Sequence, residues 1–351
     1  MSLMKVIGLI EVVIAVTAAP VFAQKNKEES NPMANHFVIG DVNFRAEVQV
    51  HPEQLLESFG PRFDNTAMVK QIWLGGNTVL TPNGLTDEFG IDGIGVLGFG
   101  EAPTGGRFLK IGVGELVRAD GKEDYRFWNR YSVQKLAPVR VAVGRNSLTV
   151  SQQASLDDNY GYHYEKQYRV LPDSKLLVIL YRLKNSGKLP FKFNQYNHNW
   201  FDSSGPATAP GYFVETAFDF STPSPAYWLA QSRGAIFSHR LSTPQPVTES
   251  KIFHSLLGAR ASNNKLLVDL PGKGLQVEVG GNFDIARFAL YAEPSALCPE
   301  VFIESELQPG KSQSWTRSYQ LKDNRVPLPA TTKPHPPMPL TDSVRVNVPL
   351  G

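Results

Sequence analysis

The chain has 351 residues, 42% of them hydrophobic, which is enough for one large domain with a substantial core. Its 35 basic and 33 acidic residues leave a net charge of +2 without a long run of either sign, so we expect no nucleic-acid partner and no binding to an anionic membrane surface. Cys298 is the only cysteine, which excludes an intramolecular disulfide.

The first 23 residues have the pattern of a secretory signal peptide. Lys5 precedes an apolar run from Val6 to Ala19, and a small-x-small ending closes at Ala23. A membrane anchor is the competing interpretation, but the run is shorter than the roughly 20 residues of a spanning helix and contains Glu11. We therefore expect cleavage near Ala23 and a secreted or periplasmic protein with no membrane association after cleavage.

A single β-rich domain is predicted over residues 38–322. The polar residues 24–37 predict a disordered lead-in, and the Pro-rich residues 323–351 predict a tail outside the core. Between them, alternating or β-branched segments separated by turn residues predict strands at 36–40, 44–50, 69–80, 108–116, 139–144, 148–156, 162–171, 176–187, 191–200, 212–220, 266–281, 287–294 and 312–321. The best helix candidate is 51–59. We predict an all-β fold, a large antiparallel supersandwich with few short helices.

Turn residues predict three tight connections within this domain. The segments "LKNSGKLP" and "VDLPGKGLQVEV" have the Gly and Asn placement of hairpins, and "LQPGKSQSW" favours a type II turn. The first of them predicts that 176–187 and 191–200 pair with each other as an ordinary hairpin.

Three polar residues interrupt the end of the predicted strand 191–200. Asn197, His198 and Asn199 stand in a row between Tyr196 and Trp200. An isolated histidine in a strand is more often structural than catalytic. Amide groups beside flat aromatic faces are, however, the combination that sugar sites use, so a carbohydrate site is an equal possibility here.

Two motifs carry a resemblance to a known family. The stretch "YNHNWFDSSGP" resembles the corresponding motif of aldose 1-epimerases (galactose mutarotases) and related hexose-6-phosphate epimerases, and "ALCPEVFIESELQPGKSQSWTRSYQL" resembles the end of those proteins. The resemblance implies a galactose mutarotase-like fold, a carbohydrate substrate, no cofactor, His198 as general acid and Glu300 as general base. Glu304, two positions beyond Phe302 on the same strand face, is the substitute base.

The chain departs from the family at an earlier sugar-binding histidine, because no histidine occurs between Asp87 and Leu116. Glu88, Glu101 and Lys110 are the polar candidates in its place, and Arg62, Lys110, Arg118 or Arg130 would favour an anionic sugar. His163 lies on an alternating strand and is expected to reach the site. The predicted substrate-binding residues are Asn197, Asn199, Trp200, Glu101, Lys110, Arg130 and His163.

Other kinds of site lack their motifs. No histidine pair has the spacing of "HExxH", so we predict no metal, and "GFGEAPTGG" lacks the ending of a phosphate loop. Two alternatives stay open on the same scaffold: a polysaccharide lyase or glycosidase-like enzyme that uses His198, His163, Tyr196 and an arginine, and a non-catalytic carbohydrate-binding protein. The sequence does not indicate the sugar or the oligomeric state.

Overall fold

The computed structural model describes residues 36–119, 124–204, 213–218, 229–231, 234–236, 260–293 and 295–323. All of them lie in one compact unit, Met33–Pro327. The predicted signal peptide, nearly all of the lead-in and the tail beyond residue 323 lie outside the described residues. Within the described part of the chain, no helix is long and apolar enough to cross a membrane.

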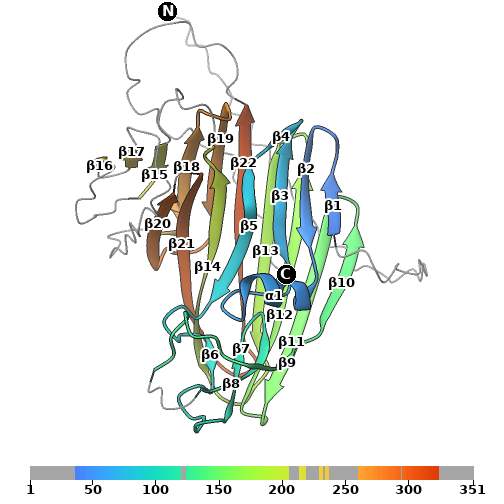
Figure 1. Cartoon of the computed structure of the whole chain (residues 1–351), viewed down its shortest axis with the longest axis vertical. Helices are drawn as coiled ribbons and strands as arrows, with labels where there is room; N and C mark the ends of the chain where they lie inside the picture. Colours follow the sequence, from blue (N-terminus) through green and yellow to red (C-terminus); the bar gives the residue numbers. More distant parts are fainter. Residues whose placement is uncertain are drawn as a thin grey trace, which may run out of the picture. The chain divides into compact units, whose positions relative to one another are not determined.

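Two large antiparallel sheets form the body of this unit (Figure 1). In order across the eight-stranded sheet, the strands are β1 (His36–Gly40), β2 (Phe44–Gln49), β3 (Met68–Leu74), β5 (Leu80–Phe89), β14 (Phe191–Asp202), β21 (Ala296–Leu307) and β20 (Arg287–Glu293), with β4 (Asn77–Thr78) paired to β3. In order across the ten-stranded sheet, they are β10 (Val139–Gly144), β11 (Ser147–Leu156), β12 (Tyr160–Leu171), β13 (Leu176–Asn185), β22 (Ser312–Asp323), β19 (Leu275–Gly281), β18 (Lys265–Leu270), β15 (Phe213–Thr216), β17 (Gly234–Ile236) and β16 (Leu229–Gln231).

The remaining elements are short. A third, four-stranded sheet contains β6 (Val96–Leu97), β7 (Arg107–Lys110), β8 (Gly114–Val117) and β9 (Val133–Leu136). Among the described residues, the helices are α1 (Pro52–Phe59) and a 3-10 turn at Ala261–Asn263. Helix α1 begins where predicted, with His51 accepting a hydrogen bond from the backbone of Gln54. The predicted all-β antiparallel fold is confirmed.

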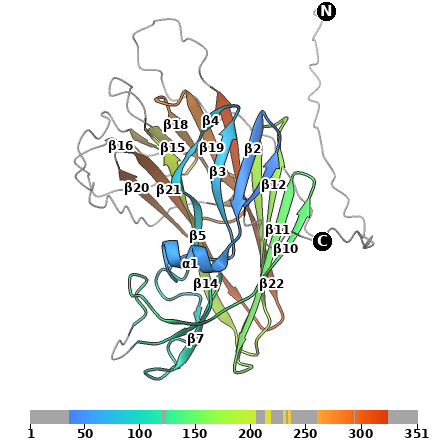
Figure 2. The ribbon, with the colours of Figure 1, turned by 45° about the vertical axis from the view of Figure 1, so that its right-hand side comes forward.

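The two large sheets lie face to face (Figure 2). Buried side chains from both sheets form the main core between them. Leu85 and Phe193 from the eight-stranded sheet belong to the same buried cluster as Leu183 and Trp315 from the ten-stranded sheet. These side chains alternate along their strands with residues that face away, as a half-buried pleated sheet requires. The eight-stranded sheet therefore has an inner face toward the core and an outer face, which carries the site described below.

One predicted connection is wrong. β13 pairs with β12 and β22, whereas β14 pairs with β5 and β21, so the turn between β13 and β14 passes from one sheet to the other instead of closing a hairpin. Local turn chemistry is the same in both cases, which is why the sequence pattern does not distinguish them. The hairpin between β18 and β19 is confirmed, and Gly310, with φ of +75°, occupies the position of the predicted type II turn that requires glycine.

The sequence pattern also missed β5. Pro82, Asn83 and Gly84 are turn residues, yet they lie inside this ten-residue strand. Gly84 has φ of +66°, and a Cβ there would lie 2.3 Å from the carbonyl oxygen of Val69, so only glycine allows β3 and β5 to approach this closely. This strand matters because it pairs with β14, and its side chains on the outer face lie beside those of β14.

Candidate active site

Strand register brings His198 opposite Glu300. β14 and β21 pair at Gln195 with Ile303 and again at Phe201 with Leu297, and five residues separate these pairs on each strand. His198 and Glu300 are the middle residues of the two intervening segments, so they are cross-strand neighbours. On its other side, β14 pairs with β5.

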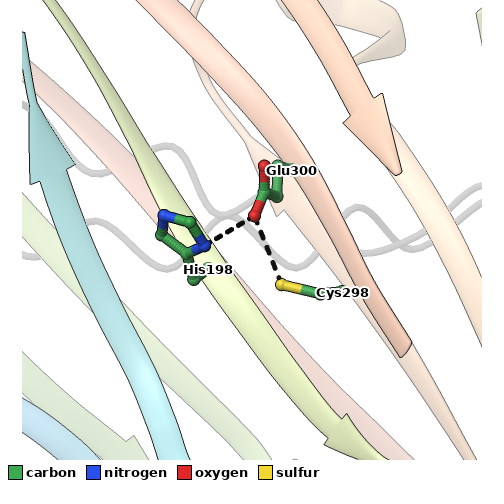
Figure 3. A group of neighbouring side chains, drawn as sticks. All are labelled: His198, Cys298 and Glu300. Carbon is green, nitrogen blue, oxygen red and sulfur yellow. Dashed lines mark hydrogen bonds and ion pairs between the residues drawn. The ribbon is translucent and has the colours of Figure 1, made fainter. Parts of the chain in front are cut away.

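Both ring nitrogens of His198 contact a carboxylate. Its Nδ1 lies 2.7 Å from Glu300 Oε1 (Figure 3), and its Nε2 lies 2.9 Å from Glu88 Oε2. The side chains of His198 and Glu300 are each 9% exposed, whereas that of Glu88 is fully buried. The imidazole is thus held between two acidic groups, one buried and one reachable from solvent.

Glu88 is fixed by further donors. Arg62 Nε donates to Glu88 Oε2 at 2.8 Å, and the Tyr196 hydroxyl donates to the same oxygen at 2.5 Å. The other oxygen, Oε1, is buried and has no hydrogen-bond partner within the described part of the chain. Glu88 therefore holds the Nε2 side of His198 rigidly, while one of its oxygens stays unsatisfied.

The charges explain the protonation of this group. Burial by itself would lower the pKa of His198, but the charge and hydrogen bond of Glu300 and those of Glu88 outweigh it and raise the pKa to about 9. Burial would raise the pKa of Glu88, but the hydrogen bond from His198 and the charge of Arg62 outweigh it and lower the pKa to about 2. At neutral pH His198 is an imidazolium that donates one N–H to each carboxylate.

Aromatic rings surround the histidine. Phe63 meets its ring edge-on at 5.0 Å, and Trp200 lies nearly parallel to it at 6.2 Å with an interplanar angle of 11°. Tyr291 packs edge-on against Trp200 at 5.6 Å, and Phe127 lies under the guanidinium of Arg62 at 4.3 Å. Flat apolar faces next to charged groups suit a ligand with both C–H surfaces and hydroxyls.

Trp200 lies beside His198 as expected, but Asn197 and Asn199 do not. Strand alternation turns both asparagines to the inner face. Asn197 Nδ2 donates to the hydroxyl of Tyr181 at 3.1 Å, and Asn199 Oδ1 accepts from the hydroxyl of Tyr319 at 2.8 Å, both in the ten-stranded sheet. The predicted role of these asparagines beside His198 is therefore corrected: they join the two sheets.

Lys110 is near the site but cannot line it. The side chain is fully buried and donates to the carbonyl of Phe89 at 2.8 Å and to the hydroxyl of Tyr125 at 2.9 Å. Burial, only partly offset by the charge of Glu88, lowers its pKa to about 8. The prediction that Lys110 binds substrate is therefore wrong, because its ammonium group is buried and bonded within the protein.

Three other predicted residues lie on exposed surface. Glu101 accepts a hydrogen bond from Tyr160 at 3.0 Å, His163 is exposed on β12 of the ten-stranded sheet, and Arg130 is exposed in the segment before β9. No contact among the described residues joins them to His198 or Glu300. Glu304 is likewise exposed, so the structure does not support it as the substitute base.

The sequence analysis named Arg62 and Glu88 as polar candidates but did not predict that they contact each other or that Glu88 contacts His198. Pairing of β5 with β14 places Glu88 opposite Tyr196, and this register becomes visible only once β5 is recognised as a strand. Arg62 comes from the segment between α1 and β3, whose position no local pattern predicts.

Cys298 completes a group of three potential metal ligands. Its Sγ lies 3.4 Å from Glu300 Oε1, and one ligand atom each from His198, Cys298 and Glu300 lie within 4.8 Å of one another (Figure 3). Cys298 and Glu300 are two positions apart on β21 and therefore share a face. The sequence analysis paired His198 with Glu300 but gave Cys298 no role, because no motif with metal-ligand spacing contains it.

Comparison with known proteins identifies the fold. No protein-family model matches the sequence, and no curated protein matches it. Solved structures do match: a galactose mutarotase related enzyme from Lactobacillus acidophilus (11% identity, TM-score 0.51, 82% of this chain and 98% of that one), a galactose mutarotase-like protein from Lactobacillus casei ATCC 334 (11%, 0.51, 82% and 100%) and an aldose epimerase homologue from C. elegans (12%, 0.51, 82% and 98%). With its antiparallel sheets and this likeness, the chain has the galactose mutarotase-like fold.

Proposed function

We propose that this protein is an aldose 1-epimerase-like enzyme that acts at the anomeric carbon of a sugar or sugar derivative. The observation that carries the proposal is the contact of 2.7 Å between His198 Nδ1 and Glu300 Oε1 on the outer face, where both side chains retain some exposure. Aromatic rings flank the pair, and the fold is one on which solved structures are named as mutarotase-related.

The pair has the two groups that the reaction needs. Opening a cyclic hemiacetal requires a proton delivered to the ring oxygen and a proton removed from the anomeric hydroxyl. His198 as imidazolium supplies the first, and Glu300 as carboxylate accepts the second. Each transfer contributes roughly 10² to 10⁴ in rate. Rotation about the bond next to the opened carbonyl, followed by the reverse transfers, closes the ring as the other anomer.

Glu88 determines which proton is used. Its Oε2 accepts the N–H at Nε2 and is itself held by Arg62 and Tyr196, so the proton at Nδ1 is the one that faces Glu300 and solvent. When His198 gives up the Nδ1 proton, the Nε2–H bond to Glu88 keeps the ring in place. Glu88 thus acts as the positioning residue of the proposed acid.

Substrate must separate the two catalytic groups. A distance of 2.7 Å between Nδ1 and Oε1 leaves no room for the two sugar oxygens that would each need to lie within about 3 Å of its catalytic partner. We expect the distance between His198 Nδ1 and Glu300 Oε1 to lengthen in a sugar complex, with the sugar ring stacked against Trp200.

Polarimetry on a panel of aldoses and sugar acids tests the proposal. His198→Gln and Glu300→Gln are each expected to lower the rate by roughly 10² to 10⁴. Glu304→Gln is the matched control, because Glu304 lies on the same strand but is exposed. Acceleration of mutarotation that survives both site variants, or no acceleration with any sugar, would contradict the proposal.

The same samples distinguish the alternatives. A lyase would produce an absorbing unsaturated product from an oligosaccharide, and a binding protein would bind glycan without accelerating mutarotation. The lyase hypothesis loses support because His163 lies on the other sheet and the Tyr196 hydroxyl is bonded to Glu88. Export of the protein is also a proposal. Mass spectrometry of the exported protein would identify its N-terminal residue and so test cleavage near Ala23.

A further inference from the structure

We propose that His198, Cys298 and Glu300 form a binding site for a borderline-soft divalent cation of the Zn²⁺ type. The atoms that the contacts within this group bring together are His198 Nδ1, Cys298 Sγ and Glu300 Oε1. Zinc is bound by this combination of imidazole, thiolate and carboxylate, whereas Mg²⁺ and Ca²⁺ prefer oxygen ligands alone.

The three ligand atoms lie within 4.8 Å of one another, so their positions have to adjust to hold an ion. Tetrahedral zinc, with bonds of about 2.0 to 2.3 Å, holds its ligand atoms about 3.3 to 3.6 Å apart. The distance from Cys298 Sγ to Glu300 Oε1 is already 3.4 Å. The distance from His198 Nδ1 to Glu300 Oε1 is 2.7 Å, so that pair has to open by about 0.6 Å to admit the ion.

The surroundings of His198 resemble those of a histidine that binds a metal. A ligating imidazole usually donates its second N–H to a carboxylate, which fixes the ring and directs the other nitrogen at the ion. Here Glu88 takes the Nε2 side of His198, and Arg62 holds Glu88 in turn. The ring is therefore oriented with Nδ1 toward Cys298 and Glu300 (Figure 3).

Ligand exchange keeps the charge of the group constant. The cation replaces the proton on His198 Nδ1 and the thiol proton of Cys298, so two protons leave as two positive charges arrive. The remaining exposure of His198 and Glu300 gives the ion access from solvent. Three protein ligands leave the fourth tetrahedral position for water. Cys298 itself is fully buried.

Metal binding has a consequence that rests on the proposed function. Zn²⁺ would occupy the nitrogen of the proposed acid and an oxygen of the proposed base at the same time. The loaded protein would then be unable to exchange protons with a sugar, so Zn²⁺ is expected to inhibit mutarotation and a chelator to restore it.

Cobalt titration of the full mature chain, stripped with chelator, tests the site. Because Cys298 is the only cysteine, any thiolate-to-cobalt absorption in the near ultraviolet reports this residue. We expect such a band at one equivalent of Co²⁺, its loss on addition of Zn²⁺ and its absence in Cys298→Ser. His163→Ala is the control for an exposed histidine and is expected to keep the band.

The Co²⁺ affinity of a Glu88 variant and the effect of Zn²⁺ on mutarotation complete the test. Glu88→Gln is expected to weaken Co²⁺ binding by about 10- to 100-fold. In each variant the mutarotation rate is measured with and without Zn²⁺. The ratio of the two rates is expected to be low in the wild type and close to one in Cys298→Ser. Absence of the band in the folded wild-type protein would overturn the metal site even if mutarotation is fast. A band without mutarotation would support the metal site and contradict the proposed function.

Discussion

β14 separates two clusters of charged groups, one on each face of the eight-stranded sheet. On the inner face, Lys166 Nζ lies 2.9 Å from Asp64 Oδ2 and 3.1 Å from Asp87 Oδ2, and Arg317 contacts Gln195 nearby. On the outer face lie Arg62, Glu88, His198 and Glu300. In each cluster one cation lies between two carboxylates: Lys166 between Asp64 and Asp87, and His198 between Glu88 and Glu300.

The two clusters differ in the group that holds the mobile proton. Burial would lower the pKa of Lys166, but the charges of Asp64 and its other neighbours raise it far above the range in which proteins function. The pKa of His198 lies at about 9, and its side chain is not completely buried. A cation between two carboxylates is therefore a structural cross-link on one face and a group suited to proton transfer on the other.

The largest effect that would test this contrast is expected from Lys166→Met. The change leaves Asp64 and Asp87 buried without their cation, so the free energy of unfolding should fall by about 3 to 5 kcal/mol. Denaturant unfolding measures it, and Lys184→Met, at an exposed position on β13, is the control. Equal stability of the two variants would show that the inner cluster is not a structural cross-link.

Neighbouring residues of β14 should respond differently. Asn199→Ala leaves the Pro299 carbonyl and the Tyr319 hydroxyl without their partner, so we expect a loss of about 1 to 3 kcal/mol in unfolding free energy. Trp200→Ala should instead weaken sugar binding by about 0.5 to 1.5 kcal/mol, or up to about tenfold in affinity, which Asn199→Ala should not do. Calorimetric titration with the sugar found by polarimetry, together with denaturant unfolding, separates the two effects. A common pattern for both variants would contradict the division into two faces.

The stability of the outer cluster should depend on pH. Because the folded state raises the pKa of His198 from 6.5 to about 9, its contribution is complete below pH 6.5 and is lost as the pH rises toward 9. Lys110, with a pKa lowered to about 8, acts in the opposite direction above pH 8. Between pH 6.5 and 8 the unfolding free energy should therefore fall by about 2 kcal/mol more in the wild type than in His198→Gln. Parallel curves for the two proteins would rule out a raised pKa.

Glu88→Gln should shift the pH dependence of activity. Removal of one carboxylate lowers the pKa of His198, so the alkaline limit of mutarotation should move down by about one pH unit, equivalent to 1.4 kcal/mol. The pH profile of kcat measures the limit, and Glu304→Gln should leave it in place. An unchanged limit in Glu88→Gln would mean that Glu88 does not act through His198.

The sequence predicted most strands because their alternation is local, and the resemblance to the epimerases directed attention to His198 and Glu300. The same alternation places Asn197 and Asn199 on the face opposite His198, so their inner position was available from the strand period alone. Glu88 was named as a polar candidate, but its position beside His198 could not be predicted from local patterns. Its strand contains the turn residues Pro82 and Gly84, and the close approach of Gly84 to Val69 depends on a neighbouring strand and not on local propensity.

Pro299 lies in a gap in the backbone pairing between β14 and β21, next to the proposed catalytic pair. Proline has no N–H to donate, and the backbone pairing of β14 with β21 ends at Gln195 and resumes at Phe201, on either side of His198. Locally the two strands are joined across this gap by side chains, among them the hydrogen bond from Asn199 to the Pro299 carbonyl at 2.6 Å. We therefore expect β14 and β21 to separate here around a bound molecule while the backbone pairs on either side of the gap stay formed.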